Sequence, residues 1–383
     1  MTCNICLSKK IKYYNFGKFP KCHDFKKINV KLKKYSFILK QCQKCSIIQL
    51  VKKGSDNTFI PRLSWIHNKE PSEHLKFLHQ KIKKMIDTNK KILFISEFDE
   101  IIYNNFKNKK NVSILSKIIS NKKYKNQFEI IKKIQDQNIK KIKKKIGDFD
   151  CIVCCRILEH AYELPKLIER IKQFLKSEGE FIFEIPDSNK PLNQGDIGML
   201  WEEHPLYFTE KSFKSAMYNL GMKVTSSKRF LYPQEDALLF TVKPYSFKKK
   251  LNINLNYNQA ENYFKKCLKI KKKNYKFIFN NFKKGFNTIF FGAGHRTVVY
   301  INYLKIENFV SFLVDDDKNK KQLFFPGTNL KIYESEFLKN KKIDFCYLSV
   351  NINLEEKIIK KIRSINKYLE FYSTSTESKF FKG

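Results

Sequence analysis

Four cysteines near the N-terminus are the residues whose types and spacing most directly predict chemistry. They form two Cys-x-x-Cys pairs, Cys3 with Cys6 and Cys42 with Cys45. Each tight turn lets two thiolates reach one ion, and the second pair completes a tetrahedral site of four sulfurs. Such a site has no open coordination position, so it predicts a structural zinc ion and not a catalytic one. The alternatives are four reduced surface thiols or a redox pair in each turn.

A second candidate for chemistry is the segment 201–208, with the sequence WEEHPLYF. It comes shortly after a predicted strand, at the place where α/β folds bind their ligands. Its His204 can act as a base near neutral pH, and the adjacent Glu203 can orient that ring or raise its basicity. The alternative is an ordinary polar turn on the surface at the start of a helix.

A glycine turn, Gly292-Ala293-Gly294, follows an apolar run near the C-terminus. Without a third glycine this pattern is weak evidence for a dinucleotide site, although the acids at 315–317 have the spacing of a ribose-binding carboxylate. A helix N-terminus beside such a turn suits a diphosphate, and Arg296 is well placed to assist. We expect His295 to cap or pack, and not to catalyse.

Alternating strands and helices are expected to position these residues. We expect strands at 91–95, 150–155, 180–185, 288–291, 310–314 and 345–350, and helices at 73–87, 164–175, 294–304 and 354–365. Gly179 is expected in the turn before the third strand, and Pro186 is expected to end that strand. This alternation predicts parallel sheets covered by helices, and hence an α/β fold class. The Lys- and Asn-rich stretch 247–285 is expected to be helical.

The composition indicates a folded protein of several domains. The chain has 383 residues, 42% of them hydrophobic, and a net charge of +39. The excess charge is almost all lysine and is spread along the chain, which favours codon bias over a nucleic-acid or membrane surface. The six other cysteines lie mostly in apolar runs, as expected of free thiols in a reducing compartment. With no apolar leader and no run long enough to span a bilayer, we expect a cytoplasmic protein without a transmembrane segment.

Several motifs in order then resemble one family. DCIVCCRILEH and FIFEIPD resemble strands four and five of a class I S-adenosylmethionine (SAM) methyltransferase. Further segments are similar to those of one group of these enzymes: TCNIC with NFGKFP, FILKQCQKCSIIQL, EEHPLYF, FFGAGHRTVVYINYLKI, VDDDKNKKQLFFPGTNLKI and YLSVNINLEE. Nearly end to end, the chain resembles the sugar C-methyltransferases of deoxysugar biosynthesis, which act on nucleotide-linked keto sugars.

The resemblance implies three parts of the chain. These are a zinc-binding module at 1–60, a central SAM-dependent methyltransferase domain of Rossmann-like fold at 70–245, and a smaller Rossmann-like substrate-binding domain at 286–383. The Lys- and Asn-rich segment 246–285 is expected to be a helical linker between the last two. The resemblance further implies two cofactors, SAM and a structural zinc ion, and a nucleotide-sugar substrate.

The resemblance also assigns roles to site residues. In the family a His-Glu-His run supplies the base that removes a proton from the carbon beside the keto group, and the enolate then attacks the sulfonium methyl. By position His204 is this base and Glu203 is its neighbour, while the preceding Tyr and His of the family are Trp201 and Glu202 here. Gly292, Gly294 and Arg296 would hold the nucleotide sugar.

The cofactor loop departs from the family pattern. Where the family shows Glu-Ile-Gly-Ser-Asn-Asp-Gly, residues 94–100 read FISEFDE, so Ser96 and Asp99 are the remaining candidates for cofactor binding. The second strand, near 112–117, ends in Ser116 and lacks the acid that grips the ribose. The paired tyrosines that precede the family's central domain are also replaced here, by IPRLS at 60–64.

Three functions follow. The first is methyl transfer from SAM to a nucleotide-linked sugar. The alternative is a non-catalytic, methyltransferase-like protein that binds a sugar nucleotide, as the loss of the loop glycines would allow. The third is a basic zinc protein that binds nucleic acid, which the even spread of lysine disfavours because such proteins cluster basic and aromatic residues on one face. The oligomeric state cannot be read from the sequence.

Overall fold

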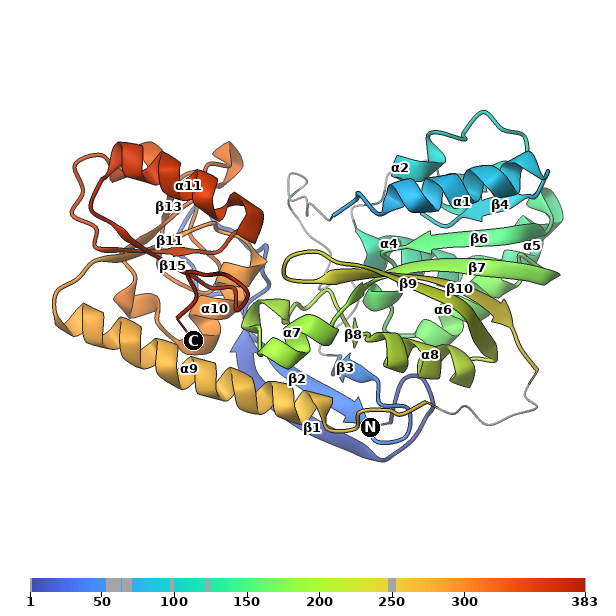
Figure 1. Ribbon diagram of the computed structural model, residues 1–383, viewed down its shortest axis with the longest axis horizontal. Helices are drawn as coiled ribbons and strands as arrows, with labels where there is room; N and C mark the ends of the chain where they lie inside the picture. Colours follow the sequence, from blue (N-terminus) through green and yellow to red (C-terminus); the bar gives the residue numbers. More distant parts are fainter. Residues whose placement is uncertain are drawn as a thin grey trace.

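The computed structural model of the chain describes residues 2–52, 63, 71–96, 100–120, 124, 126–246 and 253–382. These residues form three sheets with helices packed on them (Figure 1). The two larger sheets contain parallel strands connected through helices, so the predicted α/β fold class is confirmed.

The central sheet has six strands in the order β5-β4-β6-β7-β10-β9. Its strands are β4 (Ile92–Phe94), β5 (Val112–Ile114), β6 (Phe149–Cys155), β7 (Leu175–Asp187), β9 (Met222–Phe230) and β10 (Asp236–Pro244). The first four of the spatial order are parallel, and β10 and β9 are antiparallel additions at one edge. The strand order reverses between β4 and β6, and such a switch point is where open α/β sheets bind ligands.

Short helices connect these strands. They form helices that pack on the sheet because their apolar residues recur on one face. They are α1 (Leu75–Asp87), α2 (Glu100–Tyr103), α3 (Leu115–Ile119), α4 (Gln127–Asp136), α5 (Ile139–Ile146), the 3-10 turn η3 (Leu158–His160), α6 (Leu164–Lys172), α7 (Asn189–Gln194), the 3-10 turn η4 (Ile197–Met199) and α8 (Glu210–Asn219). In α6 the predicted stripe is the buried face, formed by Leu164, Leu167, Ile168 and Ile171.

Strand β7 differs from the prediction at both ends. It begins at Leu175 and includes Gly179, so this glycine lies in the strand and not in a turn. Pro186 does not end the strand either, because it pairs with Ala237 of β10. The parallel partner β6 ends at Cys155 opposite Glu184, so Pro186 lies beyond that ladder and its missing N–H costs no bond there.

The C-terminal sheet is wholly parallel, in the order β13-β12-β11-β14-β15. Its elements are β11 (Thr288–Phe291), α10 (His295–Leu304), β12 (Phe312–Val314), β13 (Ile332–Tyr333), β14 (Phe345–Leu348), α11 (Ile352–Ile365) and β15 (Glu370–Ser373), with 3-10 turns at Glu307–Phe309, Lys318–Lys320 and Ser335–Leu338. The predicted strands and helices of this region are present, with ends that differ by a few residues.

The N-terminal region forms an antiparallel sheet of β1 (Ile11–Phe19), β2 (Tyr35–Cys42) and β3 (Ile48–Leu50). Its fourth strand, β8 (Leu206–Tyr207), comes from the segment that follows His204. Of the stretch 247–285 that was predicted to be helical, residues 247–252 lie outside the described residues and 253–258 are not helical. The helix α9 (Gln259–Lys283) follows them and runs from the C-terminal sheet to β1 and β2 (Figure 1). The N-terminal strands, α9 and α10 therefore share one hydrophobic core.

Candidate active site and cysteine cluster

A pocket of about 400 Å³ opens between the central and C-terminal sheets. It lies beyond the carboxyl end of β6, close to the switch point of the central sheet. Its lining includes Arg156, Trp201, His204, Gln234, His295 and Arg296. Residues from loops of the central part and from the start of α10 in the C-terminal part therefore face one space, although they are far apart in the sequence.

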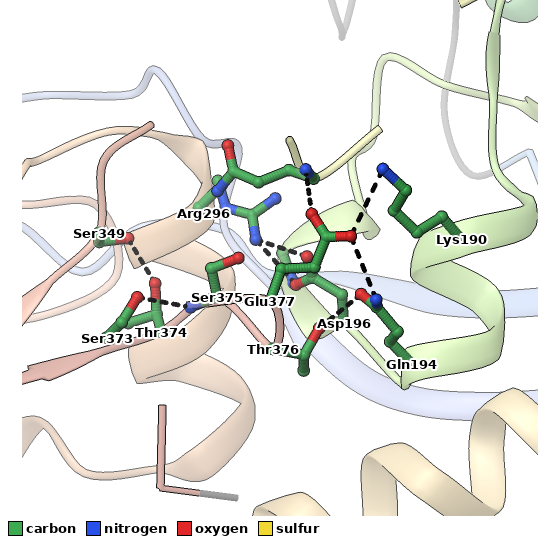
Figure 2. A network of polar contacts seen from close by, with 12 residues as sticks. Lys190, Gln194, Asp196, Arg296, Ser349, Ser373, Thr374, Ser375, Thr376 and Glu377 are labelled. Carbon is green, nitrogen blue, oxygen red and sulfur yellow. Dashed lines mark hydrogen bonds and ion pairs between the residues drawn. The ribbon is translucent and has the colours of Figure 1, made fainter. Parts of the chain in front are cut away.

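Polar contacts beside the pocket join the C-terminal turn after β15 to the central part (Figure 2). Glu377 accepts a hydrogen bond from Gln194 of α7 at 3.2 Å and forms an ion pair with Lys190 at 3.4 Å. It also accepts the backbone N–H of Gln234, a pocket residue in the β9–β10 loop, at 2.5 Å. Arg296 of α10 forms a second link through Asp196, at 2.6 Å and 2.8 Å. The pocket is thus bounded by two side-chain links between the sheets.

His204, the predicted base, lines this pocket from the loop between η4 and β8. Its ring centroid lies 4.6 Å from that of Trp201 and 4.7 Å from that of His160. Burial lowers the pKa of His204 well below its ordinary value, and the neighbouring His160, His295 and Arg156 lower it further. The imidazole is therefore neutral near neutral pH and has a lone pair that can accept a proton.

Glu203, the predicted neighbour of the base, points toward the N-terminal region. Its Oε1 lies 3.3 Å from Nδ1 of His23, and burial raises its pKa well above the ordinary value, with Glu202 adding to the effect. Glu202 accepts the backbone N–H of Cys22 at 2.6 Å. Among the described residues no hydrogen bond joins Glu203 to the ring of His204. The two carboxylates thus attach this segment to the N-terminal region and do not orient the imidazole directly.

Arg156 is a pocket residue that the sequence reasoning missed. It follows β6 with a φ of 52°, and its Nε donates to the buried carboxylate of Glu184 at 3.0 Å. The other side of Glu184 contacts Nε2 of His74 at 3.0 Å, and Nδ1 of His74 contacts the Tyr232 hydroxyl at 3.0 Å. Burial alone would raise the pKa of Glu184, but Arg156 and His74 lower it overall. This chain of contacts fixes a guanidinium at the pocket.

A signal for Arg156 and His160 was present in the motif CCRILEH, because both stand directly after a strand that ends at the switch point. His74 gave no such signal, since it precedes α1 as one polar residue among several.

The residues expected to hold the cofactor lie at the ends of β4 and β5. Ser96 is buried two residues after β4, and Asp99 lies outside the described residues. Ser116 stands in α3, two residues after β5, and its N–H donates to the carbonyl of Ile95 at 3.1 Å. The Ser116 hydroxyl is buried and has no hydrogen-bond partner among the described residues. Of the segment at 60–64, only Leu63 is described.

The glycine turn after β11 is built as a tight crossing and not as an open loop. Gly292 has a φ of 97°, and a Cβ there would lie 2.5 Å from the carbonyl oxygen of Ser349, so only glycine fits. Asp315, which has the spacing of a ribose-binding acid, accepts the N–H of Ala293 at 2.7 Å and pairs with Lys320 at 2.8 Å. Gly294 caps α10, and the next residues, His295 and Arg296, reach the pocket.

His295 packs as expected. Its ring stacks on Trp201 with centroids 4.9 Å apart, and its Nε2 lies 3.2 Å from the carbonyl oxygen of Gly198. Arg296, expected to assist a diphosphate, reaches the pocket, and its guanidinium pairs there with Asp196.

The four cysteines lie together as the spacing predicted. Cys3 and Cys45 have their Sγ atoms 3.6 Å apart, and Cys6 and Cys42 have theirs 3.5 Å apart. Tetrahedral zinc with bonds of about 2.3 Å needs sulfurs about 3.8 Å apart, so this donor set fits the ion. Gln49 donates its amide to Cys3 Sγ at 3.2 Å. The backbone N–H of Lys44 and that of Cys45 point at Cys42 Sγ, at 3.3 Å and 3.5 Å.

Comparison with known families matches both larger parts of the chain. Residues 69–227 match a methyltransferase domain, and residues 248–369 match the C-methyltransferase C-terminal domain. The chain thus combines a class I methyltransferase domain with the C-terminal domain of C-methyltransferases, and by these domains it is a SAM-dependent methyltransferase. The comparison with curated proteins finds no match.

Solved structures similar to this chain include two bacterial methyltransferases. One is a S-adenosylmethionine-dependent methyltransferase from Clostridium acetobutylicum ATCC 824, with 15% identity over 45% of this chain and 93% of that chain and a TM-score of 0.33. The other is the N-methyltransferase NodS from Bradyrhizobium japonicum WM9, with 11% identity over 46% of this chain and 100% of that chain and a TM-score of 0.29.

In the part of the chain that the structure describes, no helix is long and apolar enough to cross a membrane.

Proposed function

We propose that this chain methylates a carbon beside the keto group of a nucleotide-linked sugar, with His204 as the base. The observation that carries the proposal is the position of His204, a neutral imidazole on a pocket between the two matched domains. A methyltransferase domain alone would serve many acceptors. The C-methyltransferase C-terminal domain on the far wall favours a carbon acceptor.

His204 would accept the proton from the acidic carbon, and the negative charge would move to the carbonyl oxygen of the sugar. A weak base needs help at that oxygen, and a fixed positive group in a dry site supplies it most effectively. Arg156 lines the same pocket and is held by Glu184, so we assign it to the developing oxyanion. Trp201 and His295 stack over one wall and would keep water from the carbanion.

SAM supplies an electrophilic methyl group when it is bound. Ser96 and Asp99 after β4 and Ser116 after β5 are the residues that we propose to hold it. The buried hydroxyl of Ser116, which has no hydrogen-bond partner among the described residues, suits a ribose hydroxyl, so the residues present fit this part of the cofactor. Ser116 would bind it through one oxygen, where the family uses a carboxylate.

The nucleotide would bind along the C-terminal domain. The N-terminus of α10, with Gly292 and Gly294 before it, offers backbone N–H groups to a diphosphate. Arg296 stands in the first turn of that helix, and Asp196 would fix its direction, so that one face of the guanidinium serves the phosphate.

The remaining parts follow the same proposal. The module at 1–60 would hold a structural zinc ion through Cys3, Cys6, Cys42 and Cys45, which the sulfur separations support. Residues 70–245 would form the SAM domain, 246–285 the linker and 286–383 the substrate domain.

The experiment is a methyl-transfer assay with protein that holds one equivalent of zinc, isotopically labelled SAM and a panel of nucleotide-linked keto-deoxyhexoses, with the matching non-keto sugars as controls. We expect a labelled product with at least one keto sugar and none with its non-keto match. Transfer to an oxygen of a non-keto sugar would contradict the proposal.

The second candidate, a non-catalytic protein that binds sugar nucleotides, is favoured by Ser116 at the position of the ribose-binding acid. Calorimetry with SAM separates the two. Micromolar binding supports the enzyme, whereas no binding at millimolar SAM, together with binding of a nucleotide sugar, supports the second candidate.

A further inference from the structure

Three side chains of types that can bind metals lie together beside the pocket, in addition to the cysteine cluster, and one of them, His204, lines the pocket. Glu159 and His160 are neighbours on η3, directly beyond the carboxyl end of β6, and His204 comes from the loop before β8. Strand β8 packs on η3, which brings the two segments together. One ligand atom from each of the three side chains lies within 4.8 Å of the others.

From this arrangement we infer that Glu159, His160 and His204 form a second metal site, open to the pocket, for a divalent transition-metal ion. Its occupancy would prevent His204 from accepting a proton. This consequence rests on the function proposed above, whereas the site itself does not.

The separations suit a single ion after small movements. An ion at the centre of three atoms that are 4.8 Å apart lies about 2.8 Å from each, and zinc bonds to nitrogen and oxygen are about 2.0–2.2 Å long. Shifts of less than about 1 Å in each side chain therefore close the site. The separation between Nε2 of His160 and Oε1 of Glu159 is already 3.8 Å.

The donor set selects the kind of metal. Two imidazoles and one carboxylate suit zinc, cobalt or nickel, whereas calcium and magnesium prefer oxygen ligands alone. Three protein ligands with a fourth position toward a cavity are the arrangement of an exchangeable site, in contrast to the closed set of four sulfurs.

Burial gives an independent reason to expect a ligand. His160 is only 2% exposed, and its Nδ1 has no hydrogen-bond partner among the described residues. A buried polar atom without a partner is costly, and an ion bound to Nδ1 would satisfy it, whereas an ion bound to Nε2 would not. The positive charge of Arg156, which would repel an ion, is offset by its ion pair with Glu184 at 3.0 Å.

Cobalt titration of the full chain, loaded beforehand with one equivalent of zinc to fill the cysteine cluster alone, tests this site without any substrate. We expect one further equivalent of Co²⁺ to bind with d–d bands in the visible region and without a thiolate charge-transfer band, because only nitrogen and oxygen donors are present. His160→Gln should weaken this binding by at least about 100-fold, since even residues behind a ligand contribute about 10–100-fold. His79→Gln, a change in the ring that stacks on Phe106 in another part of the chain, is the control and should leave binding unchanged.

Failure to bind cobalt beyond the cysteine cluster would overturn the inference, and so would unchanged binding in the folded His160→Gln protein. If circular dichroism shows that His160→Gln is unfolded, His204→Gln, at a partly exposed position, replaces it. Unchanged cobalt binding in that variant would likewise overturn the inference. In the methyl-transfer assay, stoichiometric Co²⁺ should abolish turnover in the wild type. A cobalt site without any methyl transfer would contradict the proposed function and leave the metal site standing.

Discussion

Gln49 and Leu206 pair directly across β3 and β8, and this pair connects the cysteine cluster to the segment that contains His204. The side-chain amide of Gln49 donates to Cys3 Sγ, while its backbone aligns Leu206, two residues after His204. The N-terminal module thus does more than complete the fold. It supplies β3, and the pairing of β3 with β8 fixes the position of the loop that contains His204.

We therefore expect zinc removal to impair catalysis as well as stability. Cys42→Ser should lose zinc and lower both the melting temperature and kcat, because structural zinc contributes directly to folding free energy. Metal content, thermal melting and methyl transfer measure the three effects. Cys22→Ala, a buried cysteine outside the cluster, is the control and should retain its zinc. Full activity in zinc-free Cys42→Ser would show that the module does not position His204.

Gln49→Leu should be a milder form of the same defect. It keeps the β3–β8 pairing but removes the hydrogen bond to Cys3 Sγ and the bond that Gln49 Oε1 accepts from the N–H of Asn4, so zinc affinity should fall by about 10–100-fold. Competition with a chromophoric chelator measures this change. Equal zinc affinity in wild type and variant would mean that the bond at 3.2 Å does not tune the thiolate.

Arg156→Met should lower kcat by about 100- to 1,000-fold with a smaller effect on KM, because oxyanion stabilisation acts mainly in the transition state. Glu184→Gln should lower kcat less, since it removes the group that fixes the guanidinium. Arg170→Met, a change in an arginine of α6 that bonds the carbonyl of Gln137, is the control. A raised KM with unchanged kcat would assign Arg156 to ground-state binding.

The ion pair between Arg296 and Asp196 should stabilise the junction of the two larger domains. Asp196 is 2% exposed at its side chain, and Asp196→Asn leaves a largely buried guanidinium without its counter-charge, which costs about 3–5 kcal/mol of unfolding free energy. Lys379→Met removes the exposed pair with Glu356 and should cost about 0–1 kcal/mol. Urea unfolding compares the two. An equal loss of unfolding free energy in the two variants would contradict the conclusion that the Arg296–Asp196 ion pair is buried.

Stability should fall in mild acid through His295. Burial lowers its pKa from 6.5 to about 3, with Arg296 and His23 lowering it and the carbonyl of Gly198 raising it. The folded state thus holds this ring neutral, and the stabilisation is complete above pH 6.5 and declines toward pH 3. Between pH 6.5 and 5 the wild type should lose about 2 kcal/mol more than His295→Gln. Urea unfolding at pH 6.5 and pH 5 measures this difference. If the unfolding free energy of both proteins falls by the same amount, the His295 ring takes up protons as easily in the folded state as in the unfolded state.

Much of the fold was predictable because its signals are local. The stripe of α6, the run of β11 and the glycine turn after it each depend on a few neighbouring residues, and each lies where the pattern put it. The continuation of β7 through Pro186 was not predictable, because it depends on how far β6 extends beside it.

The site was predictable only in part for the same reason. The cysteine cluster follows from spacing within two turns, and the resemblance led to His204. The contacts of Glu203 with His23, of Arg296 with Asp196 and of Arg156 with Glu184 join distant segments, and no local pattern encodes them.

Proton exchange at the substrate carbon tests the role of His204 most directly. In deuterium oxide, wild-type protein with a keto sugar that it methylates should introduce deuterium beside the keto group, or transfer methyl with loss of that proton. His204→Gln should remain folded and lose both activities by at least about 100-fold, while His79→Gln retains them. Exchange and methyl transfer at the wild-type rate in His204→Gln would contradict the account.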